Sequence, residues 1–181
     1  LRIGAEHMLF GWDHLLFVLG LLLLTPVRKI LWVISAFTAG HSLTLAITAL
    51  GLLRLPSGPV ELLIALSIFF LAVEVVRKQA GRTSLTIRQP WIVAAGFGLL
   101  HGLGFAGALA AIGLPGGQEI WALLLFNLGV ELGQILFVAA ILGGYWLISR
   151  MPVVRQDWLL RPALYLVGSL GAYFTVSRIF I

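Results

Sequence analysis

The chain contains no cysteine and has few charged residues. Without cysteine, disulfides and thiolate metal ligands are excluded. Only 10% of the 181 residues are Asp, Glu, Lys or Arg, against about 25% in an average soluble domain. Hydrophobic residues make up 60% of the chain, and the mean hydropathy is +1.06. This composition predicts a polytopic membrane protein embedded in a lipid bilayer.

Acidic residues are the minority of the charges, with 7 Asp and Glu against 12 Lys and Arg. The basic residues are spread over the turns between apolar runs and form no stripe, so nucleic-acid binding is not expected. The positions of the basic residues instead predict which side of the membrane each loop faces, because Lys and Arg concentrate in cytoplasmic loops. Arg2, Arg54 and Arg178 would lie on one side and the other nine on the opposite side. Both termini are therefore expected outside the cytoplasmic (inner) membrane of a bacterium.

Apolar runs are long enough to cross a bilayer six times, since one helical crossing needs about 20 residues. Breaks that contain proline, such as Pro26 and residues 55–59, separate them. The runs cover approximately residues 5–24, 30–52, 58–77, 91–112, 119–148 and 158–178. The sequence thus predicts an all-α fold, a six-transmembrane-helix bundle, as a single transmembrane domain over residues 1–181.

Ionisable side chains lie inside these runs, where water does not solvate them and where their cost makes them functional candidates. His7 and His14 are seven residues apart, which would place both on one face of the first helix. His14 and residues near the centres of three further helices would supply nitrogen or carboxylate at similar depth, and imidazole with carboxylate suits a borderline transition metal. The predicted metal ligands are His7, Asp13, His14, His41, His101 and Glu131.

Other polar residues would lie above and below this central layer. Asn127 and Gln134 share a face of the fifth run with the central glutamate. Glu61 falls near the outer end of the third run and Glu74 near its inner end, while Glu6 lies at the outer end of the first. Together they predict a polar path from the outside to the cytoplasm.

A structural explanation competes with the functional one. Any one of these residues alone is better explained as a hydrogen bond between membrane helices. The set as a whole favours function, because unpaired ionisable groups in a bilayer are costly. Asp13 also suits a second role, that of a carboxylate orienting the ring of His14.

Four motifs resemble the HupE/UreJ family of integral membrane proteins. They are GAEHMLFGWDHLLF at residues 4–17, HSLTL at 41–45, GLLHGLGFA at 98–106 and NLGVELGQ at 127–134. The resemblance implies a metal-associated membrane protein of six or seven helices, from a family that is linked to hydrogenase and urease gene clusters and proposed to pass nickel. The chain looks most like the second branch, whose members often carry an extra extracytoplasmic region. Because the sequence begins with Leu1, we expect it to be a fragment, a processed chain or the ordered part of a longer one.

One part of the better-studied nickel branch has no counterpart here. That branch has a second histidine and a glutamate shortly after the His-Gly of the fourth helix. This chain has Phe105 and Ala106 in that neighbourhood.

The leading hypothesis is a permease for a divalent transition metal, with nickel first and zinc, cobalt or copper as alternatives. Glu6 and His7 would capture the ion, the central ligands would hold it, and Glu74 would help to release it inward. A second hypothesis is an intramembrane metal-dependent hydrolase with a His-ligated zinc. In that enzyme Ser42 would position water or substrate, and Glu131 or Asp13 would be the general base. A third is a homo-oligomer, scaffold or metal-storage subunit within a larger assembly.

Overall fold

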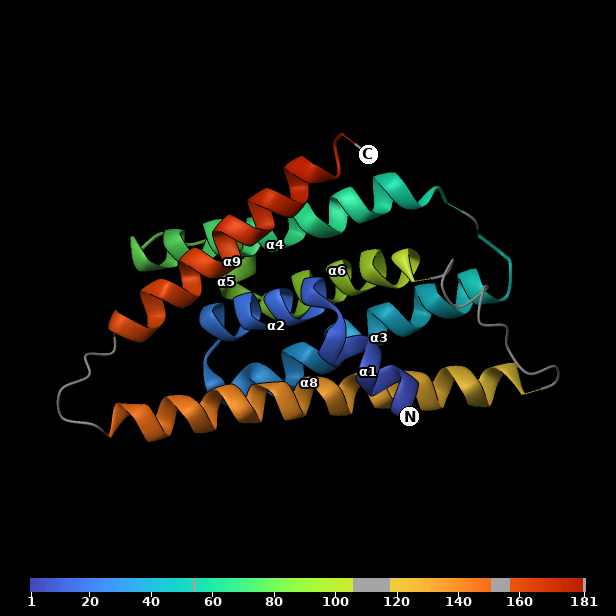
Figure 1. Cartoon of the computed structure of the whole chain (residues 1–181), viewed down its shortest axis with the longest axis horizontal. Coiled ribbons are helices and arrows are strands. Elements are labelled where there is room, and N and C mark those ends of the chain that lie inside the picture. The colour runs from blue at the N-terminus through green and yellow to red at the C-terminus, as the bar shows by residue number, and fades with distance from the viewer. Residues whose placement is uncertain (54, 106–117, 151–156, 181) are drawn as a thin grey trace.

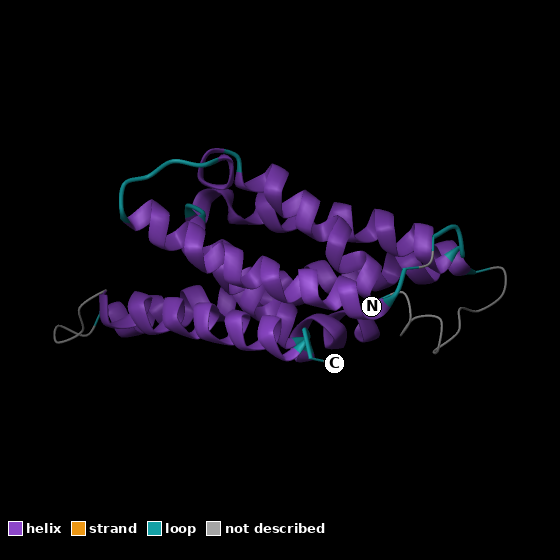
Figure 2. Ribbon diagram, turned by 90° about the horizontal axis from the view of Figure 1, so that it is seen from above, coloured by secondary structure: helices purple, strands orange, loops and turns teal. Residues whose placement is uncertain are grey.

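Long helices that run back and forth dominate the computed structural model, which describes residues 1–53, 55–105, 118–150 and 157–180. These residues form helices joined by turns and contain no strand, as Figure 2 shows. The predicted all-α class is therefore confirmed. The helices are α1 (Arg2–Phe10), α2 (Trp12–Leu24), α3 (Val27–Ala49), α4 (Ser57–Gln79), α5 (Leu85–Arg88), α6 (Pro90–Gly104), α8 (Glu119–Ser149) and α9 (Asp157–Ser177).

The helices alternate in direction along the longest axis of the molecule (Figure 1). The turn from α2 to α3, the short helix α5 and the last turn of α8 lie towards one end. The last turns of α3 and α6 and the first turn of α8 lie towards the other end. This alternation is what the spacing of the apolar runs predicts.

The outer surface of the bundle is apolar, while polar side chains are buried within it. On α8 a row of exposed leucines recurs every four residues, and Asn127 and Gln134 on another face of the same helix are buried. Such an arrangement suits a helix with lipid on one side and protein on the other. The leucines of this row are Leu124, Leu128, Leu132 and Leu136.

The predicted six spans are not confirmed. Within the described residues, four helices are long and apolar enough to cross a membrane, namely α3, α4, α8 and α9. The bent pair of α1 and α2 would make a fifth. Helix α6, predicted over 91–112, has 15 residues and ends at Gly104, and positions 106–117 lie outside the described residues. Its 15 residues rise about 22 Å, short of a hydrocarbon core of about 30 Å.

The predicted helix over residues 5–24 is also wrong, because the structure divides it at Gly11. Helices α1 and α2 meet there at an angle of 75°, and Gly11 has an extended backbone with φ −79° and ψ 98°. A Cβ atom at this position would lie 2.7 Å from the His7 oxygen and 2.9 Å from Nδ1 of His14. The bend therefore needs a residue without a side chain. It leaves His7 and His14 on different helices rather than on one face.

Two pairs of helices approach so closely that glycine is required between them. A Cβ on Gly98 of α6 would overlap the backbone oxygen of Phe37 on α3, and a Cβ on Gly102 would overlap that of His41. In the second pair, a Cβ on Gly4 of α1 would overlap the oxygen of Phe126 on α8. Membrane helices commonly pack through small residues in this way, because lipid provides no hydrophobic drive for association.

We predict that Gly98→Ala lowers the stability of the protein in detergent by about 1–3 kcal/mol, because the added methyl group forces α3 and α6 apart. The matched control is Gly96→Ala on the same helix, where an added Cβ meets nothing within 4 Å. The control should leave stability unchanged or raise it slightly. Thermal unfolding followed by tryptophan fluorescence measures both variants. Equal effects at the two positions would show that the close approach of α3 and α6 is not what Gly98 permits.

Candidate metal centre

The four histidines of the chain gather in one cluster, although each comes from a different helix. His7 is on α1, His14 on α2, His41 on α3 and His101 on α6. The ring centroids of His7 and His14 are 4.6 Å apart, and those of His14 and His101 are 5.3 Å apart. The ring of His41 lies 5.9 Å from His14 and 6.2 Å from His7. We call this group the histidine cluster.

The packing of α3 against α6 positions two of these rings. His41 follows one turn after Phe37, and the backbone of both residues contacts the glycines of α6. Thr44 Oγ1, one turn further along α3, donates to the Leu99 oxygen at 2.7 Å. Glycine contacts and this hydrogen bond thus hold His41 of α3 near His101 of α6. The bend at Gly11 brings the remaining two rings to the same place.

Aromatic side chains pack against the histidine cluster, of which His14, His41 and His101 are buried and His7 is partly exposed. The ring centroids of Phe105 and His7 are 4.0 Å apart, and those of Phe17 and His101 are 4.9 Å apart. Phe37 is 5.1 Å from His101. His41 is 0% and His101 1% exposed. Interactions with charge inside such an apolar enclosure are stronger than they would be in water.

Five ring nitrogens of the histidine cluster are buried without a hydrogen-bond partner in the described part of the chain. They are Nε2 of His7, Nε2 of His14, both nitrogens of His41, and Nδ1 of His101. A neutral imidazole has one donor and one acceptor nitrogen, so His41 leaves both unsatisfied. Each unsatisfied buried group costs about 1–3 kcal/mol. Each neutral ring carries one lone-pair nitrogen, so the cluster offers at most four lone pairs for a cation.

The distances between the rings are close to those of a shared metal site, but the rings are not oriented to form one. Four imidazoles bound tetrahedrally to one ion would have ring centroids about 5 Å apart, given the usual metal–nitrogen distance. The four measured separations, 4.6 to 6.2 Å, lie on both sides of that value. Among the described residues, however, no group of three or more His, Asp or Glu side chains is already arranged to hold a metal ion. The rings would therefore have to turn towards a common point to bind one.

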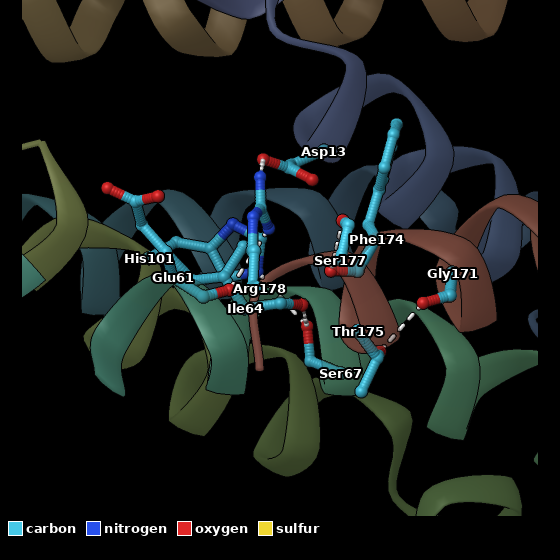
Figure 3. Close-up of polar contacts among 10 residues, drawn as sticks. All are labelled: Asp13, Glu61, Ile64, Ser67, His101, Gly171, Phe174, Thr175, Ser177 and Arg178. Carbon is cyan, nitrogen blue, oxygen red and sulfur yellow. Dashed lines mark hydrogen bonds and ion pairs between the residues drawn. The ribbon is translucent and has the colours of Figure 1, made fainter. Parts of the chain in front are cut away.

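The two predicted carboxylate ligands have other partners in the structure. Asp13 Oδ2 accepts a hydrogen bond from Nη2 of Arg178 at 2.7 Å, and Arg178 also donates to the backbone oxygen of Glu61 at 3.0 Å. Figure 3 shows this ion pair between α2 and the residue after α9. Glu131 accepts from the hydroxyl of Ser35 on α3. Oδ1 of Asp13 is buried without a partner.

The amides of α8 are partly satisfied. Gln134 Oε1 accepts from Thr38 at 2.9 Å, and Asn127 Nδ2 donates to the Leu123 oxygen at 2.8 Å. The other side-chain atom of each amide, Gln134 Nε2 and Asn127 Oδ1, is buried without a hydrogen-bond partner in the same described residues. Gln134 therefore joins α8 to α3, whereas the Asn127 hydrogen bond stays within α8. Each amide still has one polar atom without a partner inside the bundle.

The three other glutamates of the predicted polar path lie away from the histidine cluster or have partners of their own. Glu6 forms a surface ion pair with Arg2 at 2.6 Å, and the Glu61 side chain is exposed. Glu74, only 1% exposed, accepts hydrogen bonds from Arg77 at 3.0 Å and from Ser84. It thereby ties the segment after α4 back onto that helix.

Two residues at the centre were not among the predicted site residues. Ser67 of α4 contacts Nε2 of His101 at 3.2 Å, and Arg178 pairs with Asp13. Ser67 had a detectable signal, a hydroxyl in the middle of an apolar run. Arg178 contributed only to the charge count, because 165 residues separate it from Asp13. Ser42, a candidate catalytic residue, donates its proton to the Thr38 oxygen at 2.6 Å.

The comparison with protein families gives one result that covers almost the whole chain. The family model described as HupE / UreJ protein matches residues 1–178. The chain therefore belongs to the HupE/UreJ family, as the four motifs indicated. No curated protein and no solved structure matches it.

We predict that His41→Leu raises the free energy of unfolding by about 1–3 kcal/mol in chelator-treated detergent solution, because it removes two unpartnered nitrogens from an apolar site. The control is Thr48→Val on the same helix. The Thr48 hydroxyl already donates to backbone oxygens of Thr44 and Leu45, so its removal relieves no unsatisfied group. Tryptophan fluorescence during heating compares both variants with the unaltered protein. A destabilised His41→Leu variant would mean that the ring is held for its packing.

Proposed function

We propose that this HupE/UreJ-family protein is a membrane permease for a divalent transition metal, with nickel as the first candidate cargo. The observation that carries the proposal is the set of five unpartnered imidazole nitrogens inside the bundle. Buried polar groups in native proteins nearly always have partners, so exceptions call for an explanation. A cation bound through one lone-pair nitrogen of each ring would give a partner to at most four of these nitrogens.

The choice of cargo follows from the chemistry of the donors. Imidazole nitrogen suits nickel, zinc, copper and iron, whereas calcium and magnesium prefer sites built from oxygen. The chain has no cysteine, so thiolate does not bias the site towards copper(I). Affinity alone does not separate nickel from zinc or cobalt at such a site. Nickel comes first because the HupE/UreJ family is associated with its transport.

Asp13 is the group through which the ion would first approach from the outer end. Its side chain is 24% exposed, while the rings of His41 and His101 behind it are fully buried. In the structure Arg178 neutralises this carboxylate. An arriving divalent ion would compete with the guanidinium for Asp13 and then pass to the imidazoles.

If the protein is such a permease, this arrangement of helices would be its closed state. Because His41 and His101 are fully buried, ions would reach them only after the helices around them move. The bend at Gly11 separates α1, which packs on α8, from α2, which packs on α4. Rotation of α1 about this point would open the side of the histidine cluster that His7 covers. At the inner end, Glu74 would assist release only after Arg77 and Ser84 leave its oxygens.

The hydrolase alternative lacks a specific observation in its favour. The Ser42 hydroxyl donates its proton to the Thr38 oxygen, and Glu131 accepts a hydrogen bond from Ser35. Neither group has the arrangement of a nucleophile and base in contact. We therefore carry transport forward as the proposed function.

We expect His14→Ala and His41→Ala each to lower uptake of radioactive nickel into proteoliposomes more than about tenfold, since each removes a ligand. Ser169→Ala is the control, because the Ser169 hydroxyl only donates to the Tyr165 oxygen on the exposed face of α9. It should retain uptake. Protein-free vesicles define the background, and thermal unfolding checks that each variant is folded. Unchanged uptake in both histidine variants would end the proposal.

A further inference from the structure

His101 of the cluster has a hydrogen-bond partner on another helix, and this partner is a serine hydroxyl rather than a carboxylate. Ser67 on α4 and His101 on α6 are 2% and 1% exposed. The Ser67 oxygen lies 3.2 Å from Nε2 of His101. Figure 3 shows the serine between the ring and the backbone of Ile64. Within the described residues, no other ring nitrogen of the cluster forms a hydrogen bond with a side chain.

The direction of this hydrogen bond follows from the second contact of the serine. Ser67 Oγ lies 2.6 Å from the Ile64 oxygen, and a carbonyl oxygen can only accept. The single hydroxyl proton must therefore point at Ile64, because two oxygens at this distance without a proton between them would repel. The proton of the longer contact must then come from His101. Ser67 accepts, and Nε2 of His101 donates.

This direction fixes the tautomer of the ring. A neutral imidazole carries one proton, so protonation at Nε2 leaves Nδ1 with a free lone pair. Nδ1 is the His101 atom that is buried without a partner. The neighbouring ring, that of His14, lies 5.3 Å away between centroids. The lone pair therefore lies on a buried, unpartnered nitrogen of a ring that neighbours His14 in the cluster.

We propose that Ser67 is a positioning residue that holds His101 as the Nε2-protonated tautomer and so makes Nδ1 the atom that binds the divalent cation. The second part rests on the proposed transport function, while the first concerns the metal-free protein alone. Histidines that bind metals usually donate their other N–H to a fixed acceptor, which sets the ring orientation and raises its basicity. Here a serine backed by a helix carbonyl supplies that acceptor, and no carboxylate is needed.

The test of the tautomer is nitrogen NMR on metal-free protein labelled with ¹⁵N-histidine. The chain has 4 histidines, so the spectrum is small, and His101→Gln identifies the signals of this ring. We expect His101 to be protonated at Nε2 in the unaltered protein and to become a mixture of tautomers in Ser67→Ala. Ser67→Thr, which keeps a hydroxyl, should restore the single tautomer. Protonation at Nδ1 in the unaltered protein, or no change in Ser67→Ala, would overturn the proposal.

The second measurement is nickel affinity by titration calorimetry. Ser67→Ala should bind nickel about 10–100-fold more weakly. Ser169→Ala is the matched control, because it loses a serine-to-carbonyl hydrogen bond of the same kind without touching a histidine. Equal affinity of Ser67→Ala and the unaltered protein would overturn the metal-binding part. If the unaltered protein binds no nickel at all, transport is refuted, while the tautomer assignment is still decided by the NMR spectra.

Discussion

The structure depends on one constraint, that polar groups inside a lipid-exposed bundle must find their partners within the protein. Most of them do. Glu131 accepts from Ser35, Gln134 from Thr38, and Asp13 from Arg178, so each pair also joins two segments distant in sequence. The imidazoles are the largest group that departs from this rule, since they supply five of the nine buried side-chain atoms without partners in the described residues. The requirement that buried polar groups have partners thus identifies the histidine cluster as the part of the bundle that is suited to bind a ligand.

The residues that fold the bundle also build its centre. Gly98 and Gly102 bring the backbone of α6 against that of α3, and the atoms they contact belong to Phe37 and His41. His101 lies between these two glycines, so the close approach that stabilises the helix pair also brings His101 towards His41. A fold of this kind cannot lose the contact between α3 and α6 without losing the cluster. Gly11 plays the corresponding part for the other two rings, because the bend of 75° carries His7 from α1 back over His14 of α2.

Composition and hydropathy were enough to predict the all-α membrane class, and the motifs around His14, His41 and His101 were enough to indicate the family. Three features could not be predicted in this way. The break at Gly11 depends on how closely the chain packs upon itself, which the seven-residue spacing of His7 and His14 does not reveal. The end of α6 at Gly104 lies inside an apolar run. The partner of Asp13 comes from the other end of the chain, so local periodicity suggested His14 instead.

We propose that the imidazoles of the histidine cluster together bind one transition-metal ion. X-ray absorption at the nickel edge, measured on purified protein loaded with one equivalent of nickel, tests it most directly. We expect a first coordination shell with several nitrogen ligands and the outer-shell scattering of imidazole rings, both reduced when His41 is replaced by alanine. A shell of oxygen atoms alone, or a spectrum that is the same after this replacement, would contradict it.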